Sequence, residues 1–444
     1  MFVERARRSV GMRLATIFVI TVILMIPTIM IQALISERKD RRDVAAEEVS
    51  QNWGSSQVVI GPIITVPLRF NYYDDKNSLR QMTQYAHFLP EQLDIKGGIK
   101  SQVRRRGIYD IVLYNSDLEL SGRFKKPDFE ELGIQSAEIL YESTRVEIGI
   151  TDMKGIRDTV SFLWNDQELP ANSGLDNNEI FNTGLSVKID LSEDKDLYTF
   201  KTKIKLNGSE SLMFAPVGNE TKVNLNSDWN NPGFFGAFLP DQRTIDENGF
   251  DSNWKVLHLS REYPQAWKGH SYNINKSLFG VNLLLKVDEY QKTTRTVKYA
   301  LLFISLTFLT FFLIEILSNK AIHPIQYLLI GVALVIFYTL LLSMTEYVAF
   351  HYAYLIASVG IIALVSMYTR SVLASKTQAL IIMLVLILLY GYLYIILQLQ
   401  DYALLMGSII LFVALALTMY FTRNIDWFTV LKNDNKIEKK PENS

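Results

Sequence analysis

Glu315 is the residue whose position in the sequence most suggests chemistry. Its carboxylate follows the charge-free stretch 299–314, near the end of a long apolar segment. Charge is costly inside a lipid bilayer, so an ionisable group in a membrane segment is a functional candidate by default. Two interpretations stay open for Glu315. In the structural interpretation it reaches the membrane surface or pairs with Lys320 or His323. In the functional one it has a coupling or gating role in transport.

The other residue types that carry chemistry form no recognisable motif in this sequence. There are no cysteines, which excludes disulfides, thiolate nucleophiles and cysteine-ligated metal sites. The metalloprotease, hydrolase, phosphate-loop and dinucleotide signatures do not occur. His258 and His270 match no metal spacing, and Asp152 and Asp158 form either an acid pair or a solvated turn. The sequence therefore predicts no catalytic residue, no cofactor and no metal.

A second candidate site is the segment 226–240, which mixes aromatic residues with glycine and proline. Its distinctive residues are Asp228, Trp229, Phe234 and Phe235. The glycines and prolines favour an ordered loop rather than a strand. Such a loop either presents a binding edge to a partner or ligand, or tucks its rings into the core, as buried aromatic residues commonly do.

Long apolar segments must position these residues. The stretch 14–35 has no charge and is long enough to cross a hydrocarbon core of about 30 Å. It is also longer than the apolar region of a signal peptide, which favours an uncleaved membrane helix. After residue 296, apolar segments recur with short breaks, which indicates antiparallel helices. They are centred on about 297–317, 325–345, 352–368, 378–397 and 402–422.

The charges of the short connections predict the orientation in the membrane. If the N-terminal tail 1–13 is cytoplasmic, then Lys320, Arg370 and Lys376 fall inside, as does the tail 423–444. The outer connections then carry only acidic residues, Glu346 and Asp401, as the positive-inside rule requires. One conflict remains, because four basic residues follow the first helix on the outer side, namely Arg38, Lys39, Arg41 and Arg42.

The region 36–296 between the membrane segments favours strands. Alternating apolar and polar residues occur at 185–191, 200–206 and 222–226, and further strand-forming stretches occur at 58–68, 108–114 and 281–287. Asn207 and Gly208 predict a hairpin turn. The stretch 38–53 favours a helix that continues the first membrane helix. Recurring strands with turn signals predict a sandwich-like or open β architecture.

Together these patterns predict a membrane protein of about six transmembrane α-helices. One helix is N-terminal and five are C-terminal, and a β-rich α+β extracytoplasmic domain is inserted between them. The formal net charge of −1, with no single basic block, gives no support for nucleic-acid binding. The predicted partners are the lipid bilayer and a component of the periplasm or envelope.

Several blocks of the sequence also resemble the CreD family of bacterial inner-membrane proteins, known as cell envelope integrity proteins. In the first half they are 35–38 (ISER), 59–67 (VIGPIITVP), 88–91 (FLPE), 106–109 (RGIY), 116–118 (SDL) and 228–240. In the membrane half they are 298–300 (KYA), 311–315 (FFLIE), 323–329 (HPIQYLL), 337–338 (FY) and 422–427 (TRNIDW). The resemblance implies a role in envelope integrity, and in some bacteria control by a two-component sensory system. It implies no catalytic or ligand residues.

Three functions follow as expectations. The leading one is a non-enzymatic protein of the bacterial inner membrane, with both termini cytoplasmic, which supports the cell envelope through a periplasmic domain that contacts envelope components. The alternative is a transporter or flippase-like protein that uses Glu315. A second alternative is a membrane hydrolase or transferase that acts on envelope material. Glu315 and His323 lie in family-like blocks and are the first positions to test.

Overall fold

A computed structural model describes residues 10–73, 79–134, 137–191, 195–284, 289–318, 322–399 and 402–423. The chain divides into two compact units. The membrane unit comprises Met1–Arg41 and Val287–Ser444, and the β unit comprises Arg42–Lys286. The two units are described separately below.

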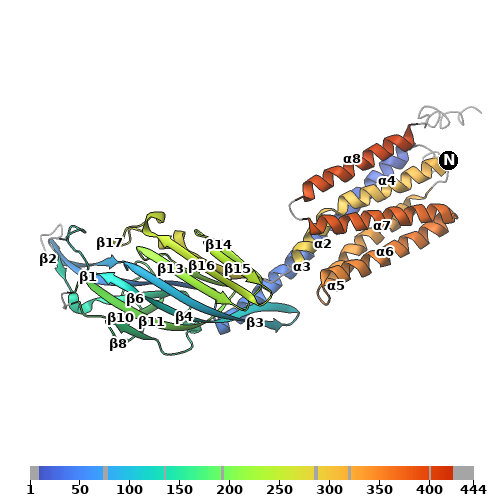
Figure 1. The fold of residues 1–444 in the computed structure, drawn as a ribbon. Coiled ribbons are helices and arrows are strands. Elements are labelled where there is room, and N and C mark those ends of the chain that lie inside the picture. The colour runs from blue at the N-terminus through green and yellow to red at the C-terminus, as the bar shows by residue number, and fades with distance from the viewer. Residues whose placement is uncertain are drawn as a thin grey trace, which may run out of the picture. The chain divides into compact units, whose positions relative to one another are not determined.

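Helices form the membrane unit (Figure 1). Six helices among the described residues are long and apolar enough to cross a membrane, one N-terminal and five C-terminal, which confirms the predicted fold class. These six are α2 (Val10–Trp53), α4 (Ala300–Ser318), α5 (Pro324–Thr345), α6 (Phe350–Leu373), α7 (Lys376–Gln398) and α8 (Ala403–Thr422). The shorter, polar helix α3 (Glu289–Lys298) precedes α4. Helix α2 continues unbroken to Trp53, so the helix predicted at 38–53 is confirmed as its extension.

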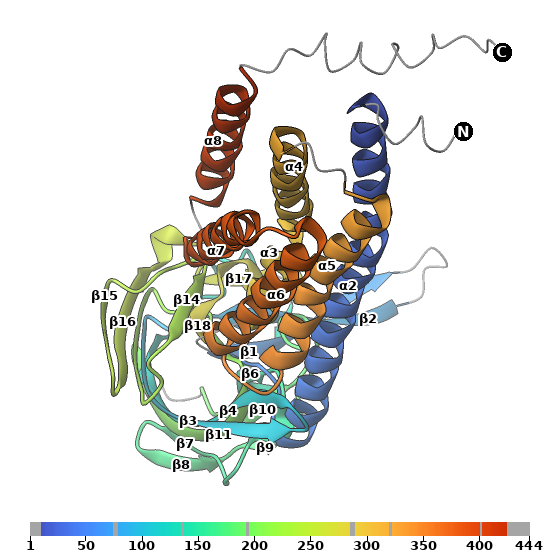
Figure 2. The same cartoon turned by 90° about the vertical axis from the view of Figure 1, so that its right-hand side faces the viewer.

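Aromatic side chains pack the centre of the membrane unit, where α5, α6 and α7 lie side by side (Figure 2). The ring of Phe337 in α5 meets Tyr354 of α6 and Tyr390 of α7 edge to face, with centroids 5.5 and 4.8 Å away. The Tyr354 hydroxyl donates a hydrogen bond to the backbone oxygen of Tyr390 at 2.6 Å. This bond satisfies a polar group that the bilayer could not, and it ties α6 to α7.

Two sheets form the β unit, and their strands are given in spatial order. The ten-stranded sheet runs β14 (Pro232–Gly236), β18 (Phe279–Leu283), β12 (Ser211–Phe214), β1 (Gln57–Tyr73), β6 (Arg145–Ile150), β10 (Gly184–Lys188) and β9 (Asn172–Ser173). In the same sheet, β2 (Leu79–Phe88) and β5 (Glu138–Ile139) also pair with β1, and β17 (Ala266–Lys268) pairs with β2. The eight-stranded sheet runs β15 (Gln242–Asp246), β16 (Gly249–Leu257), β13 (Glu220–Ser227), β3 (Gln92–Arg106), β4 (Tyr109–Lys125), β11 (Leu197–Ser209), β7 (Ser161–Trp164) and β8 (Gln167–Pro170).

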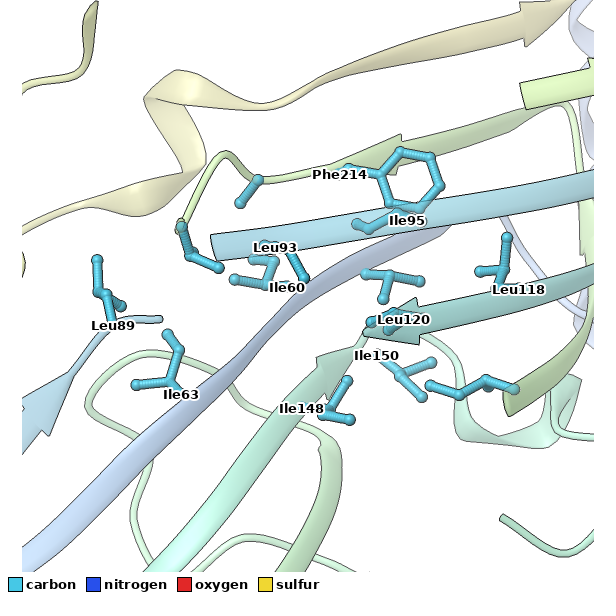
Figure 3. Packing of buried hydrophobic residues seen from close by; sticks show 14 of the residues in the cluster. Ile60, Ile63, Leu89, Leu93, Ile95, Leu118, Leu120, Ile148, Ile150 and Phe214 are labelled. Atoms are coloured by element: carbon cyan, nitrogen blue, oxygen red, sulfur yellow. The ribbon is translucent and has the colours of Figure 1, made fainter. Parts of the chain in front are cut away.

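The core of the β unit lies between these two sheets. Figure 3 shows Ile60 and Ile63 of β1 in the same cluster as Leu93 of β3 and Leu120 of β4. Strand β11 shows how the sequence produces this packing, because its side chains alternate between buried and exposed along most of its length. Burying one such apolar side chain fully contributes roughly 1.5–3 kcal/mol to stability. The strand predicted from the alternation at 200–206 is confirmed, because the apolar residues of this stretch are the buried ones.

The hairpin turn predicted at Asn207 and Gly208 is wrong. Both residues lie inside β11, where they pair with Asn115 and Tyr114 of β4. The chain turns at Glu210 instead, whose φ is +59°, and then enters the other sheet as β12. Gly208 is needed for packing, because a Cβ at this position would lie 2.3 Å from the Tyr114 hydroxyl.

The prediction that the segment 226–240 contains no strand is also wrong. Pro232–Gly236 forms β14, which pairs antiparallel with β18 and places Phe234 opposite Val281. The proline is tolerated because β14 lies at the edge of its sheet and Pro232 is its first residue. Gly236 ends the strand with φ at +102°, where a Cβ would lie 2.2 Å from the backbone oxygen of Leu278.

Candidate functional site

Glu315 lies in α4 with 1% of its surface exposed, and it has three partners. The Tyr327 hydroxyl of α5 donates a hydrogen bond to Oε2 at 2.8 Å. The backbone N–H of Ile322 donates to Oε1 at 3.2 Å. The third partner is Arg13 of α2, whose Nη1 lies 3.2 Å from Oε1. The carboxylate therefore joins α2, α4 and α5 at one end of the helices.

The chain order explains why these groups meet. Helix α4 ends at Ser318 and α5 begins at Pro324, so the short connection returns the chain beside Glu315. Arg13 lies within the first turns of α2, which brings a guanidinium to the same end. The Arg13 side chain is 24% exposed, so the ion pair lies between the helix interior and the surface. Removing one partner of such a pair leaves the other charge poorly compensated.

His323 does not pair with Glu315, contrary to that interpretation of the sequence. Its Nδ1 accepts the backbone N–H of Ile325 at 3.3 Å, and its own backbone N–H donates to Gln326 Oε1 at 2.9 Å. These reciprocal bonds form a capping box at the start of α5, and Pro324 occupies the first turn, where its missing N–H costs nothing. The other predicted partner, Lys320, lies outside the described residues. The signal for the actual partner was Arg13 itself, the last basic residue before the first apolar stretch.

A second ion pair joins α2 to α5 at the opposite end of the membrane helices from Arg13. Arg38 Nη1 lies 3.4 Å from Oε1 of Glu346, the residue that ends α5. Arg13 and Arg38 are 25 positions apart (38 − 13), or roughly 37 Å along a helix that rises 1.5 Å per residue. The two pairs thus bracket a length slightly greater than the hydrocarbon core of about 30 Å. They also show that α2 runs parallel to α5 and antiparallel to α4.

The predicted residues of the segment 226–240 have partners within the β unit. Asp228 accepts the backbone N–H and the hydroxyl of Ser101, at 2.8 and 2.6 Å. Trp229 Nε1–H donates to the backbone oxygen of Leu284 at 3.0 Å. Phe234 packs edge to face on Trp254, with centroids 5.6 Å apart. Half-buried Phe235 follows it in β14. These contacts support the interpretation that most of the rings stabilise the fold, while the binding edge stays a prediction.

Sequence reasoning missed a buried polar chain in the ten-stranded sheet. Thr65 of β1 donates its hydroxyl to Glu147 Oε2 of β6 at 2.8 Å, and Thr65 Oγ1 also lies 3.2 Å from His87 Nδ1 of β2. His87 Nε2 lies 2.9 Å from Glu179 Oε2. Thr65, His87 and Glu147 are each at most 3% exposed. The available signals were a glutamate within the apolar run 146–150 and a histidine within 86–89.

The hydrogen bonds of this chain are compatible with more than one arrangement of protons. In one arrangement Thr65 donates to an ionised Glu147, and Thr65 Oγ1 accepts a hydrogen bond from Nδ1–H of His87. If His87 Nε2–H also donates to an ionised Glu179, both ring nitrogens carry a proton and His87 is a cation. If Glu147 is protonated, it donates to Thr65, which then donates to Nδ1 of a neutral His87. The two arrangements differ only by a proton moved through Thr65.

Glu147 lies at one end of this chain, and one of its two carboxyl oxygens lacks a hydrogen bond within the part of the chain that the structure describes. Its Oε1 has no hydrogen-bond partner among the described residues. Burial raises the pKa of the Glu147 carboxyl to about 7, although the hydrogen bond from Thr65 favours the ionised form. A hydroxyl, an imidazole and a carboxylate in series also occur in nucleophilic triads. Here the hydroxyl of Thr65 is buried and already donates to Glu147.

Metal chemistry has no obvious location in the described parts of the chain. Across those residues, no group of three or more histidine, cysteine, aspartate or glutamate side chains is arranged to hold a metal ion. Two charge centres therefore stand out: the Arg13–Glu315 pair of the membrane unit and the Glu147–His87 chain of the β unit.

Comparison with known proteins covers nearly the entire chain. The family described as "Inner membrane protein CreD" matches residues 9–428. The Escherichia coli (strain K12) protein named "Inner membrane protein CreD" is 31% identical over 424 residues, which cover 94% of this chain and 93% of that relative. The match therefore includes the six apolar helices and the β unit between them. The chain belongs to the CreD family of inner membrane proteins.

Proposed function

We propose that this protein supports the integrity of the cell envelope without catalysing a reaction. Its β unit lies on the periplasmic side of the inner membrane and contacts envelope components, and both termini are cytoplasmic. The observation that carries this proposal is the insertion of a β unit between two membrane helices whose charges are distributed asymmetrically. The membrane helices anchor the chain, and the β unit supplies the surface that meets the envelope.

The charge distribution supports the orientation. Arg13 lies at the same end of the helices as the last turn of α6, where Arg370 lies, and as Lys376 at the start of α7. Arg423 follows the end of α8 at this end as well. Basic residues accumulate on the cytoplasmic side of membrane proteins, so this end is assigned to the cytoplasm.

The basic residues that conflict with this orientation have acidic partners. Arg38 pairs with Glu346 at 3.4 Å, and Arg41 pairs with Glu37 at 2.7 Å. Arg42 pairs with its neighbour Asp43 at 3.0 Å. Three of the four basic residues that follow the first apolar stretch thus have an acidic partner. Acidic residues count little in the positive-inside rule, but long translocated domains cross the membrane largely regardless of charge, so the orientation is kept.

Helix α2 contributes residues to both units. The first part of α2 is paired to α4 and α5 through Arg13 and Arg38. Its last turns belong to the β unit, where Trp53 Nε1–H donates to the Tyr114 oxygen at 3.3 Å and the Arg104 guanidinium lies 4.3 Å from the Trp53 ring. A single helix is thus held by specific contacts in both units.

Crosslinking in intact cells tests this function. A photoreactive residue is placed at Leu239, which is 64% exposed, and at Leu259, which is 80% exposed. Capture of a specific envelope component that depends on the position of the crosslinker would support the proposal. A matched control is the buried Phe214, which should capture nothing. If all exposed positions capture only lipid and abundant bystanders, the contact with envelope components is wrong.

Transport is a second candidate function, and the burial of Glu315 among the membrane helices favours it. A transport role requires the Glu315 carboxylate to change its partners during a cycle. Glu315→Gln would then abolish function while the protein stays folded and abundant. If envelope resistance to detergent is unchanged in that variant, the ion pair stabilises the helices and transport through Glu315 is excluded.

A further inference from the structure

The segment 174–183, which we call the covering segment, connects β9 to β10 and is held against β6 at two points. Asp176 of this segment forms an ion pair with Arg145 of β6. The Phe181 ring packs on Gly149 of β6, since a Cβ at this glycine would lie 2.5 Å from a carbon of the ring. Alternate residues of a strand share one face, so the covering segment lies across one face of β6.

Glu147 occupies the same face of β6, midway between these two points, and 1% of its surface is exposed. Ser186 of β10 lies directly opposite it and is 3% exposed. A third contact holds the covering segment down beside this carboxyl. Glu179 Oε2 lies 2.9 Å from Nε2 of buried His87, and the Glu179 backbone oxygen lies 3.2 Å from Nδ1 of His270.

The charged and titratable groups around Glu147 come from the elements packed against it. They are Arg145 of β6, Tyr85 and His87 of β2, and Asp176 and Glu179 of the covering segment. Strands β1 and β10 contribute the neutral Thr65 and Ser186, and Lys188 of β10 is exposed. The carboxylates at 147, 176 and 179 therefore face the single guanidinium of Arg145. One proton on Glu147 or His87 reduces this excess of negative charge.

The hydrogen bonds from Glu147 through Thr65 and His87 to Glu179 can all form only when the chain holds one extra proton. This proton lies either on the Glu147 carboxyl or on the second nitrogen of His87. When it is lost, neutral His87 has one N–H. If Nε2–H donates to Glu179, the single hydroxyl hydrogen of Thr65 has two acceptors; if Nδ1–H donates to Thr65, Nε2 faces the carboxylate without a hydrogen. Either way a buried group loses its hydrogen bond, which is costly.

We propose that these groups form a pH-sensitive latch, which holds the covering segment on the β unit while it is protonated and releases the segment when it loses one proton. The loss places a buried negative charge beneath Asp176 and Glu179, and it removes the positive charge that His87 can offer to Glu179. Burial raises the pKa of Glu147 to about 7, so release falls near neutral pH. Because release uncovers one face of β6, the surface that the β unit presents changes with pH.

This latch goes beyond the proposed envelope function and does not rest on it. It is a property of the β unit on either side of the membrane. A failure of envelope crosslinking therefore leaves the latch intact, and a failure of the latch leaves the orientation and the envelope contacts intact.

A single buried thiol measures the opening of the covering segment. Ser186→Cys places a small thiol directly opposite Glu147 in a chain without native cysteines. The rate at which a thiol reagent modifies the full chain in micelles is divided by the rate for the unfolded chain at the same pH, which removes the effect of thiol ionisation. The ratio should rise about tenfold from pH 6 to pH 8 and then level off, because the pKa of Glu147 is about 7 in the closed state and 4.5 when exposed. A ratio that does not change with pH would overturn the proposal.

A buried thiol in the other sheet separates local release from unfolding of the whole β unit. Ser252 of β16 is 0% exposed, and it is replaced by the same small thiol in Ser252→Cys. Its ratio should be at least about tenfold lower than that of Ser186→Cys at each pH, because only a larger opening reaches it. Equal ratios at the two positions would show that the covering segment does not open by itself, and the latch would be wrong.

Glu147→Gln in the Ser186→Cys chain identifies the group that loses the proton. The amide can donate to Thr65 as the protonated carboxyl does, but it cannot ionise. The ratio should therefore no longer depend on pH. A tenfold rise that persists in this variant would contradict the latch.

Glu179→Gln tests the contact on the covering segment and serves even if Glu147→Gln fails to fold. It removes the charge that faces His87, so the ratio at pH 6 should rise about threefold or more. Glu138→Gln is the matched control, because this glutamate of the same sheet is 60% exposed in its ion pair with Arg69. It should change the ratio less than about twofold. Equal effects of the two variants would overturn the proposal.

Discussion

The ion pair between Arg13 and Glu315 makes an asymmetric prediction about stability. Glu315 is 1% exposed, whereas the Arg13 side chain is 24% exposed. Arg13→Gln therefore leaves a carboxylate buried among helices without its cation, whereas Glu315→Gln leaves a guanidinium that can reach water. Removing one partner of a buried pair costs about 3–5 kcal/mol, and we expect Arg13→Gln to fall in this range.

The cost of Glu315→Gln should be smaller, because its amide oxygen can still accept the Tyr327 hydroxyl and the Ile322 N–H. Hydrogen bonds to charged groups contribute about 1.5–3 kcal/mol and neutral ones about 0.5–1.5, so the expected loss is about 1–2 kcal/mol. The double variant Arg13→Gln with Glu315→Gln should resemble Glu315→Gln alone. The coupling between the two positions is then about 3 kcal/mol or more, well above the error of a double-mutant cycle.

The absence of native cysteines provides a direct assay for the membrane unit. Ala353→Cys introduces one small thiol at a position of α6 that is 0% exposed. The rate at which a thiol reagent reacts with it, measured across a denaturant series in micelles, reports the opening of these helices. Signals of whole-chain unfolding are less suitable, because two units need not unfold together. Equal destabilisation by the two single variants, or additive effects in the double variant, would refute the reasoning.

Three further predictions concern both units. Burial raises the pKa of Glu147 from 4.5 to about 7, so protonated Glu147 stabilises the fold fully below about pH 4.5 and this contribution is lost as the pH rises through 7. Hydrogen exchange of β1 and β6 should therefore show a loss of up to about 3 kcal/mol in the wild type over this pH range. The variant Glu147→Gln should show no such loss. Gly208→Ala should destabilise the β unit by about 1–3 kcal/mol because the new methyl meets the Tyr114 ring, whereas Gly98→Ala, with only one neighbour at 3.4 Å, should cost less than 1 kcal/mol in the same melting experiment. Arg38→Gln should cost less than about 1 kcal/mol in the thiol assay, because its side chain is 37% exposed; a cost equal to that of Arg13→Gln would contradict the assignment of the two pairs.

Periodicity and apolar length predicted most of the architecture. The six membrane helices follow from charge-free segments, because a helix is the simplest way to satisfy a backbone in lipid. The strand at 200–206 follows from its alternation, which matches one buried face. Local turn signals were less reliable. Asn207–Gly208 looks like a hairpin in isolation, but the glycine makes room for Tyr114, a contact between residues far apart in the sequence.

The sites were harder to predict because their partners are distant in sequence. Glu315 was recognised as a costly charge, but its cation lies 302 positions earlier (315 − 13) on another helix. The nearer candidate, His323, was already used as a helix cap. Glu147 gave no motif, since a charge in a strand looks ordinary until its burial is known. Pairing across elements, rather than residue type, determines these sites.

The position of the β unit across the membrane is the central claim, and thiol labelling tests it most directly. Single cysteines replace Lys203, whose side chain is 72% exposed in the β unit, and Lys376 at the start of α7. A membrane-impermeant thiol reagent is applied to cells whose outer membrane has been opened. The proposed topology predicts labelling at 203 in intact spheroplasts and labelling at 376 only after the inner membrane is disrupted. Labelling at 376 with protection at 203 would contradict it.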